Sequence, residues 1–225
     1  MIRPRAIISY IEKKGWGEIR KLIAYRLKET FRKYVFERNT EILLAQSIQE
    51  SFQHFPCPPE ITIRKAELSD VENLCQIIEK HHWSTTRKEL TDWITKGYPV
   101  YVALREYRII GYTCALLELD SLNQKYLKLI HPRQDDAWGR DAFVLPEYRG
   151  AQIYQALSTV TIKALKDKGY RRVLATVFAN NLSGRTAHKK LGQKEVKEIQ
   201  TWRIFFYKRV KMKPLRENLK NEQNP

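Results

Sequence analysis

The chain has few cysteines and no long hydrophobic run, and these two features argue against several classes of protein. Its 225 residues include three cysteines, Cys57, Cys75 and Cys114, an odd number without zinc-ligand spacing, which argues against a disulfide framework or a zinc site. No stretch approaches the roughly 18 uncharged apolar residues of a membrane-spanning helix. The N-terminus lacks the apolar segment and cleavage site of a signal peptide. We therefore expect a cytoplasmic protein with ordinary, partly buried thiols.

Acidic residues are scarce relative to basic ones. The 41 Lys and Arg against 25 Asp and Glu give a formal net charge of +16 at pH 7, and the surplus is spread along the chain. A basic surface attracts polyanions in general, including nucleic acid, anionic lipid and the phosphates of coenzyme A. A nucleic-acid-binding function rests on charge alone, because no helix-turn-helix, RNP-type strand or zinc pattern accompanies it.

One stretch, Asp141 to Leu165, predicts a strand, a tight turn and a helix. The apolar strand is stopped by Pro146, and an Arg149-Gly150 turn follows. The first N–H groups of a helix have no internal acceptors and favour a bound phosphate, and glycine lets the chain turn tightly beside it. The predicted helix has apolar residues at spacings of three and four, namely Ile153, Ala156, Leu157, Val160, Ala164 and Leu165.

The segment Val144–Gly150, VLPEYRG, resembles the V-x-P-x-[YF]-R-G signature of the GNAT superfamily of N-acetyltransferases. The family continues as R-G-x-G-[IL]-[GA], so Gln152 here replaces a glycine and Tyr154 replaces a small residue. The resemblance implies that acetyl-CoA is the acyl donor, with its pantetheine on the strand and its pyrophosphate on the amides of the turn. The implied cofactor-binding residues are Phe143, Val144, Arg149, Gly150, Ala151, Gln152, Ile153, Tyr154 and Asn181.

The segment Asn181–Gln193 resembles a second family pattern, N-x-x-[AS]-x-x-x-Y-x-x-x-G-F. Gly184 stands at the small position, Gln193 replaces the aromatic residue, and His188 falls where the family usually has tyrosine. By resemblance, His188 protonates the departing thiolate of coenzyme A, and an imidazolium can do so near neutral pH. The alternative is an exposed helical histidine beside two lysines.

The incoming amine must lose a proton, for which the family often uses a carboxylate on the cofactor-binding strand. Asp141 lies three residues before Val144, so strand alternation puts the two side chains on opposite faces and directs the carboxylate toward the acceptor. Glu118 and Asp120, on the preceding strand, are rival candidates. Each of the three can equally be a solvated charge at a sheet edge. No metal is needed for this chemistry.

The order of predicted elements, βααβββαβαββ, is that of the GNAT fold, which implies an α+β domain with a splayed, mixed, mainly antiparallel sheet of about seven strands flanked by helices. We expect four parts: a basic amphipathic helical extension over residues 1–55, a Pro-rich linker over 56–60, the acetyltransferase domain over 61–210, and a charged, disordered tail over 211–225. The predicted strands are 61–66, 99–105, 109–119, 142–145, 171–177, 195–200 and 202–210, and the predicted helices are 71–78, 86–96, 150–168 and 180–191.

Two segments leave alternatives open. Residues 6–36 have the period of a basic amphipathic helix, which can pack on its own domain, form a homodimer contact, or lie on an anionic membrane as a peripheral anchor. Residues 120–140 can be a substrate-facing loop, or the arms of a longer hairpin.

These features favour an acetyl-CoA-dependent N-acetyltransferase that acts on a primary amine by direct attack in a ternary complex. The amine-bearing acceptor can be a small molecule or a protein. The alternative is a catalytically inactive member of the same fold that serves as an acyl-CoA-binding sensor or adaptor, and a nucleic-acid-binding protein comes third.

Overall fold

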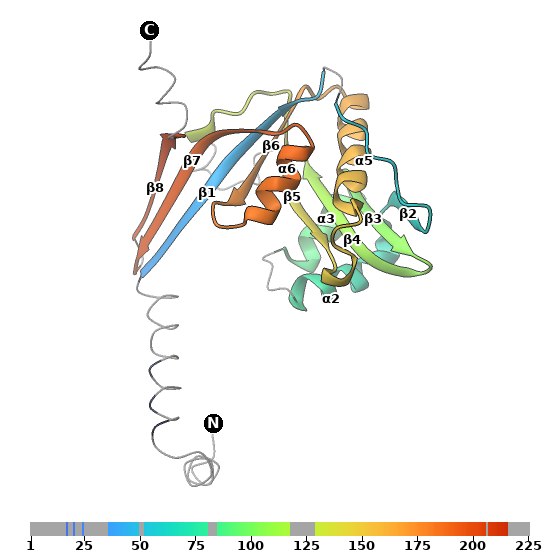
Figure 1. Ribbon diagram of the computed structural model, residues 1–225, viewed down its shortest axis with the longest axis horizontal. Coiled ribbons are helices and arrows are strands. Elements are labelled where there is room, and N and C mark those ends of the chain that lie inside the picture. The colour runs from blue at the N-terminus through green and yellow to red at the C-terminus, as the bar shows by residue number, and fades with distance from the viewer. Residues whose placement is uncertain are drawn as a thin grey trace. The chain divides into compact units, whose positions relative to one another are not determined.

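The computed structural model describes residues 36–49, 52–80, 85–117, 129–205 and 207–215, together with Gly17, Arg20 and Ala24. Its strands form one eight-stranded sheet with the order β2-β3-β4-β5-β6-β1-β7-β8 (Figure 1). The strands are β1 Phe36–Ser47, β2 Ile61–Lys65, β3 Val100–Arg105, β4 Arg108–Leu116, β5 Asp136–Val144, β6 Arg172–Phe178, β7 Lys194–Ile204 and β8 Tyr207–Pro214.

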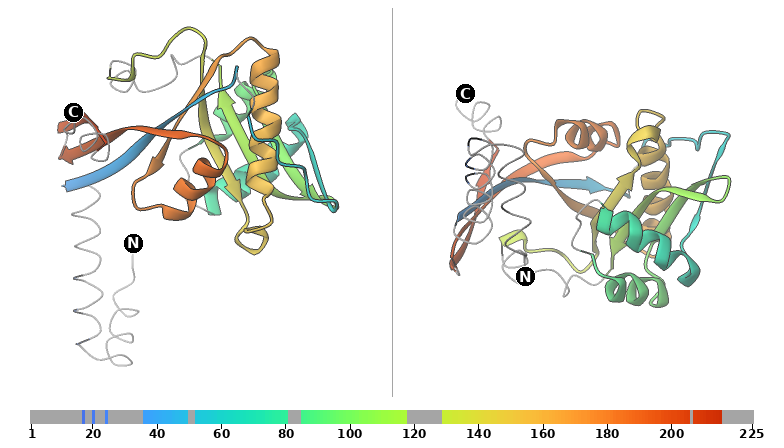
Figure 2. Two further views of the ribbon diagram at one scale, coloured as in Figure 1. Left: turned by 45° about the horizontal axis from the view of Figure 1, so that its top comes forward. Right: turned by 90° about the horizontal axis from the view of Figure 1, so that it is seen from below.

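The chain divides into two compact units, one of residues 41–199 and 212–225 and the other of residues 1–40 and 200–211. In the larger unit, the helices cover both faces of the sheet (Figure 2). Helices α2 (Val71–Lys80) and α3 (Arg87–Thr95) lie on one face, and α5 (Ile153–Asp167) and α6 (Leu182–Lys190) lie on the other. None of the described helices is long and apolar enough to cross a membrane.

Most of the predicted elements are confirmed, and so is the mixed α+β fold with a mostly antiparallel sheet. The predicted helix over 86–96 forms as α3, because Thr86 accepts a hydrogen bond from the Glu89 N–H and Glu89 bonds back to the Thr86 N–H. The predicted strands over 99–105 and 109–119 form as β3 and β4, which pair in antiparallel register.

The prediction of a helical extension through residue 55 is wrong for residues 36–47, which form β1. Residues Glu41–Ser47 pair antiparallel with β6, which adds the eighth strand. The sequence hides this strand because Ile42, Leu43 and Leu44 are all buried, and a strand covered on both faces shows no alternation. The predicted helix over residues 6–36 lies outside the described residues, apart from the helical Gly17, Arg20 and Ala24.

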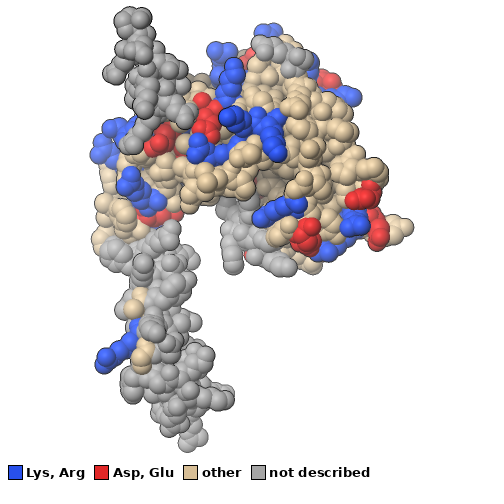
Figure 3. All heavy atoms as spheres, viewed as in Figure 1, with Lys and Arg blue, Asp and Glu red and all other residues tan. Residues whose placement is uncertain are grey.

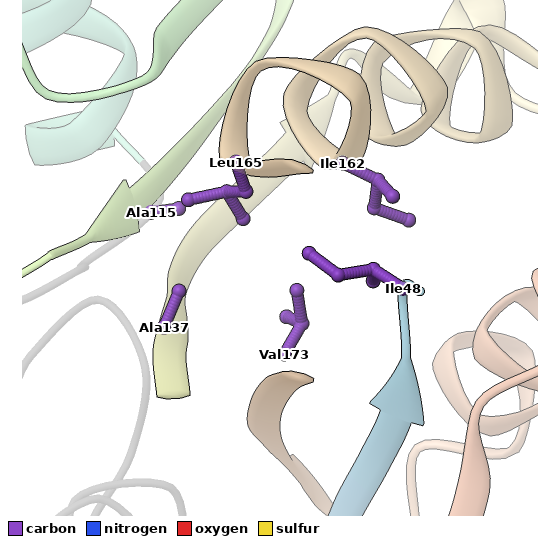
Figure 4. Packing of buried hydrophobic residues seen from close by; sticks show 6 residues of the cluster. All are labelled: Ile48, Ala115, Ala137, Ile162, Leu165 and Val173. Atoms are coloured by element: carbon purple, nitrogen blue, oxygen red, sulfur yellow. The ribbon is translucent and has the colours of Figure 1, made fainter. Parts of the chain in front are cut away.

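Ile48, which follows β1, lies in the core of the larger unit. It packs in a cluster with side chains from four other elements, β4, β5, α5 and β6 (Figure 4). The cluster comprises Ile48, Ala115, Ala137, Ile162, Leu165 and Val173. Residues that the sequence assigned to an extension therefore belong to the folded domain.

Three further boundaries differ from the prediction. Residues 136–140 belong to β5, so the hairpin-arm alternative holds for that part of residues 120–140. The last two predicted strands are divided at Phe205, in a left-handed turn with φ 52°, rather than at residue 201. The predicted disordered tail is wrong for residues 211–214, which continue β8, while residues 216–225 lie outside the described residues.

The sheet opens between β5 and β6. These neighbours pair in parallel from Asp136 opposite Arg172 to Gly139 opposite Ala175. Within the described residues of the two strands, the pairing stops there, and β5 continues to Val144 on β4 alone. The register between β4 and β5 shifts at Cys114 and Ala115, so Arg140 is an extra residue in β5. This bulge stands where the strands begin to separate, a common position for bends near functional sites.

Candidate functional site

A tight turn joins β5 to α5, and two of its residues have left-handed backbone conformations. Gly150 has φ +91°, and a Cβ added there would have no described heavy atom within 4 Å, so the space beside the turn is open. Gln152, the residue before α5, has φ 58° and ψ 16°. Glycine adopts this conformation at little cost whereas a residue with a Cβ is strained, which explains why the resembled pattern has glycine at this position.

The first turn of α5 presents backbone donors. The first hydrogen bond of the helix is donated by the Ala156 N–H to the Gln152 carbonyl at 3.0 Å. The N–H groups of Ile153, Tyr154 and Gln155 therefore have no acceptor within the helix. The side chain of Gln152 makes no capping bond. A phosphate group is the kind of anion that such a helix start binds.

Arg149 is exposed, and its side chain contacts the end of β5. Its Nε donates to the Val144 carbonyl at 3.1 Å, and its guanidinium lies 5.7 Å from the centre of the Phe143 ring. The charge is therefore fixed between the opened strand and the start of α5, where it adds to the positive end of the helix dipole.

The opened edge of β5 exposes the backbone groups of Val144 rather than those of Phe143, and the Val144 carbonyl already accepts from Arg149. The Leu145 N–H donates to the Ile110 carbonyl of β4 at 2.9 Å. Successive residues of a strand direct their backbone groups to opposite sides, so the groups of Val144 face away from β4, toward the opening, and those of Phe143 face β4. A ligand pairing with this strand would meet Val144.

Asp141 lies in β5 opposite Cys114 of β4 and is buried. The hydroxyl of Thr85, a residue that precedes α3, donates to its carboxylate. Burial raises the pKa of Asp141, against the lowering effects of the Thr85 hydrogen bond and the Arg140 charge. A carboxylate of raised pKa holds a proton more readily than an exposed one, which suits a general base.

His188 of α6 belongs to a polar chain that reaches α5. Its Nδ1 lies 2.7 Å from Gln193 Oε1, and the Tyr154 hydroxyl lies 3.1 Å from Nδ1. The two rings meet edge to face, with centroids 5.4 Å apart. Burial lowers the pKa of His188, and the Gln193 hydrogen bond opposes that effect. All three members depart from the resembled patterns, and the sequence did not predict their contact.

Asn181 caps α6. Its side-chain oxygen accepts from the Gly184 N–H at 2.9 Å and from the Ser183 hydroxyl at 3.0 Å. A Cβ on Gly184 would lie 2.7 Å from Asn181 Nδ2, so even alanine at this position would displace the capping side chain. The structure gives Asn181 a role in building the helix, and its contact with a cofactor stays a prediction.

A pocket of about 370 Å³ lies between α5 and α6. Sequence reasoning missed its lining, although the α6 members recur at the spacing of one helix face. One of its lining side chains, Lys190, carries a positive charge that can pair with an anion. The pocket lies on the face where Figure 3 shows Lys and Arg gathered around α6 and the start of β7. Its lining residues are Gln155, Leu182, Ser183, Thr186, Ala187 and Lys190.

The structure thus brings together most of the predicted site on β5, the turn and the two helices. The rival bases Glu118 and Asp120 lie outside the described residues. Within the parts of the chain that are described, no group of three His, Cys, Asp or Glu side chains is arranged to hold a metal ion.

Several solved structures resemble this chain in fold, although their sequence identity to it is low. A protein from Drosophila covers 80% of this chain at 12% identity and a TM-score of 0.57. A GCN5-related N-acetyltransferase from Sphaerobacter thermophilus covers 80% of this chain at 14% identity, with a TM-score of 0.58. A putative GNAT-family acetyltransferase from Novosphingobium aromaticivorans covers 74% of this chain at 15% identity, with a TM-score of 0.52. This chain spans 57%, 56% and 64% of their respective lengths, and at these identities the likeness concerns the fold.

The sequence comparisons decide the family. No curated protein matches the chain. The family model for the acetyltransferase (GNAT) family matches residues 66–193, which is more than half of the 225 residues and includes β5, the turn, α5 and α6. The chain therefore belongs to the acetyltransferase (GNAT) family.

Proposed function

We propose that this chain is an acetyl-CoA-dependent N-acetyltransferase that acetylates a primary amine by direct attack in a ternary complex. Acetyl-CoA is the acyl donor of the family, and family members act on amine-bearing acceptors. The observation that carries the proposal is the combination of the opened edge of β5 with the uncapped start of α5. Together they offer main-chain partners for an extended ligand that ends in phosphates.

The residues present fit this donor. The amides of Ile153, Tyr154 and Gln155 lack acceptors within α5, and the space beside Gly150 is open. Arg149 supplies a fixed positive charge next to these amides. Gln152 does not close the turn, because its backbone takes the left-handed conformation that the turn requires and its side chain is exposed. Lys190 adds a second positive charge in the pocket between α5 and α6.

When bound, acetyl-CoA supplies an activated acyl thioester, and the protein supplies binding, orientation and proton transfer. Asp141 is the candidate base that removes a proton from the acceptor ammonium, since it is buried, bonded by Thr85 and of raised pKa. It sits on β5 three residues before the opened main chain of Val144. The pair of His188 and Tyr154 is the candidate for returning a proton to the leaving sulfur.

Binding and turnover are tested separately. At a hundred times its dissociation constant, acetyl-CoA should stabilise the folded chain by about 2.7 kcal/mol, which raises the Tm of a domain of this size by roughly 5–10 °C. Release of free coenzyme A thiol is then measured on a panel of primary amines. Failure to stabilise at millimolar acetyl-CoA refutes the proposal.

A matched pair of variants tests the base. Asp141→Asn should retain acetyl-CoA binding and lose turnover by about 100-fold, in the range expected for a general base. Asp135→Asn removes a partly exposed carboxylate that faces Arg171 at 3.7 Å, and it should leave both acetyl-CoA binding and turnover unchanged. Binding without turnover of any amine by the wild-type chain would favour the acyl-CoA sensor instead.

A further inference from the structure

Two titratable side chains meet between α5 and α6, and they hold their protons in different pH ranges. Burial lowers the pKa of His188, with the Gln193 hydrogen bond opposing, so the imidazolium loses its proton below the usual range near 6.5. Burial raises the pKa of Tyr154, with a Ser158 hydrogen bond opposing. Near neutral pH the phenol therefore keeps its proton and the imidazole is neutral.

Gln193 determines which ring nitrogen of His188 carries the remaining hydrogen. Its Oε1 is an acceptor and lies 2.7 Å from Nδ1, so Nδ1–H donates to it. The contact is fixed from both sides, because Gln193 is buried and its backbone N–H also donates to the His188 carbonyl at 3.1 Å. Nε2 is left with its lone pair. The Tyr154 hydroxyl lies 3.1 Å from Nδ1 and 3.4 Å from Nε2, so its oxygen can share the Nδ1–H group with Gln193, which leaves the phenol's own hydrogen for another acceptor.

No charged group competes with this arrangement among the described residues around His188. The groups that face it are the Tyr154 hydroxyl from α5 and the Gln193 amide from the turn before β7. The basic neighbours on α6, Lys189 and Lys190, are exposed, and Arg185 forms a bidentate pair with Glu195. The titration of His188 is thus set by burial and by Gln193.

We propose that Tyr154 is the proton-donating residue of this pair, and that His188 and Gln193 are positioning residues that hold its hydroxyl. The inference rests on the proposed function, and it exchanges the roles that the sequence implied. In the step, the Tyr154 O–H bond breaks, its proton forms an S–H bond with the departing thiolate, and the phenolate regains a proton from water. The tyrosine that position 188 lacks is supplied from the neighbouring helix.

The first test is spectroscopic and needs no turnover. Nitrogen-15 NMR of the His188 ring in the full chain should show the hydrogen on Nδ1 at neutral pH and a pKa below the ordinary value near 6.5. Gln193→Leu removes the acceptor and should abolish the preference for Nδ1–H, whereas Gln193→Glu supplies another acceptor and should keep it. A wild-type ring that carries its hydrogen on Nε2 would overturn the positioning role.

The second test is kinetic. If Tyr154 donates the proton, kcat should stay level between about pH 6.5 and pH 8.5, because the phenol keeps its proton there. If the His188 imidazolium donates it, kcat should fall as pH rises through the lowered pKa. Tyr154→Phe should reduce kcat by about 100-fold with the acetyl-CoA Kd changed less than about threefold.

Tyr170→Phe is the matched control, since its hydroxyl donates to the Leu117 carbonyl at 3.2 Å, outside the site, and kcat should be unchanged. The two proposals fail in different ways. No acetyl-CoA binding or no turnover by the wild-type chain refutes the proposed function and the donor role with it. Normal kcat in Tyr154→Phe, beside an active wild type, overturns the inference alone.

Discussion

The turn before α5 contains a strained residue whose relief should stabilise the protein. Gln152 has φ 58° and ψ 16°, it is exposed, and its side chain makes no capping hydrogen bond. Replacing it with glycine therefore removes backbone strain at no cost in side-chain contacts. The left-handed conformation costs a residue with a Cβ about 1–2 kcal/mol.

Part of that gain is offset in the unfolded chain. Glycine has more conformations to lose on folding, which costs about 0.4–1 kcal/mol. The net effect expected for Gln152→Gly is an increase of about 0.5–1 kcal/mol in the free energy of unfolding, or a Tm higher by roughly 1–4 °C for a chain of this length. Gln152→Ala keeps the strain and should change stability by less than about 0.5 kcal/mol.

Gly150→Ala is the reciprocal substitution two residues earlier. Gly150 has φ +91°, and an added Cβ would meet no described atom within 4 Å, so its cost comes from the backbone alone, at about 1 kcal/mol. The three variants are compared by thermal and urea denaturation. The backbone argument is refuted if Gln152→Gly is no more stable than Gln152→Ala, or if Gly150→Ala is neutral.

Three further predictions concern buried polar groups. Tyr112 is 1% exposed and its hydroxyl has no described partner, so Tyr112→Phe should leave the Tm unchanged or raise it, whereas Tyr170→Phe loses a hydrogen bond worth about 1 kcal/mol; the opposite order in differential scanning calorimetry contradicts this. Arg172→Ala leaves the fully buried Asp136 carboxylate without its ion-pair partner and should lower the free energy of unfolding by about 3 kcal/mol. Arg87→Ala removes one partner of an exposed pair and should lower it by less than about 1 kcal/mol; equal losses in urea denaturation would contradict this prediction. The pKa of Asp141 is raised in the folded state, so the folded chain binds more protons and stability falls as pH rises through that pKa; Asp141→Asn should exceed the wild type in Tm at neutral pH, by a margin that disappears on acidification.

Local signals in the sequence were enough for much of the site. The strand, turn and helix over 141–165 could be predicted because each is defined by neighbouring residues: an apolar run, the stop at Pro146, a glycine that takes a positive φ, and apolar residues at helical spacing. The cap at Asn181 follows the same rule, since it bonds to an amide three residues away.

Contacts between residues far apart in the chain could not be predicted from the sequence. The Tyr154 hydroxyl meets His188 across 34 positions, and Thr85 meets Asp141 across 56. Helix and strand periods determine which face a side chain occupies, but they do not determine which element packs against that face. The polar chain of Tyr154, His188 and Gln193, and with it the assignment of a proton donor, therefore required the tertiary structure.

The sequence by itself determined the family, the order of elements from β2 to β7, and the turn that begins α5, because these depend on local pattern and motif spacing. The tertiary structure alone decided that Phe36–Ser47 is a strand beside β6 and that the pairing of β5 with β6 ends at Gly139. The physical reason is the same in both cases. Pairing between strands depends on backbone hydrogen bonds to residues far away in the chain, and a strand buried on both faces leaves no alternation from which the pairing could be read.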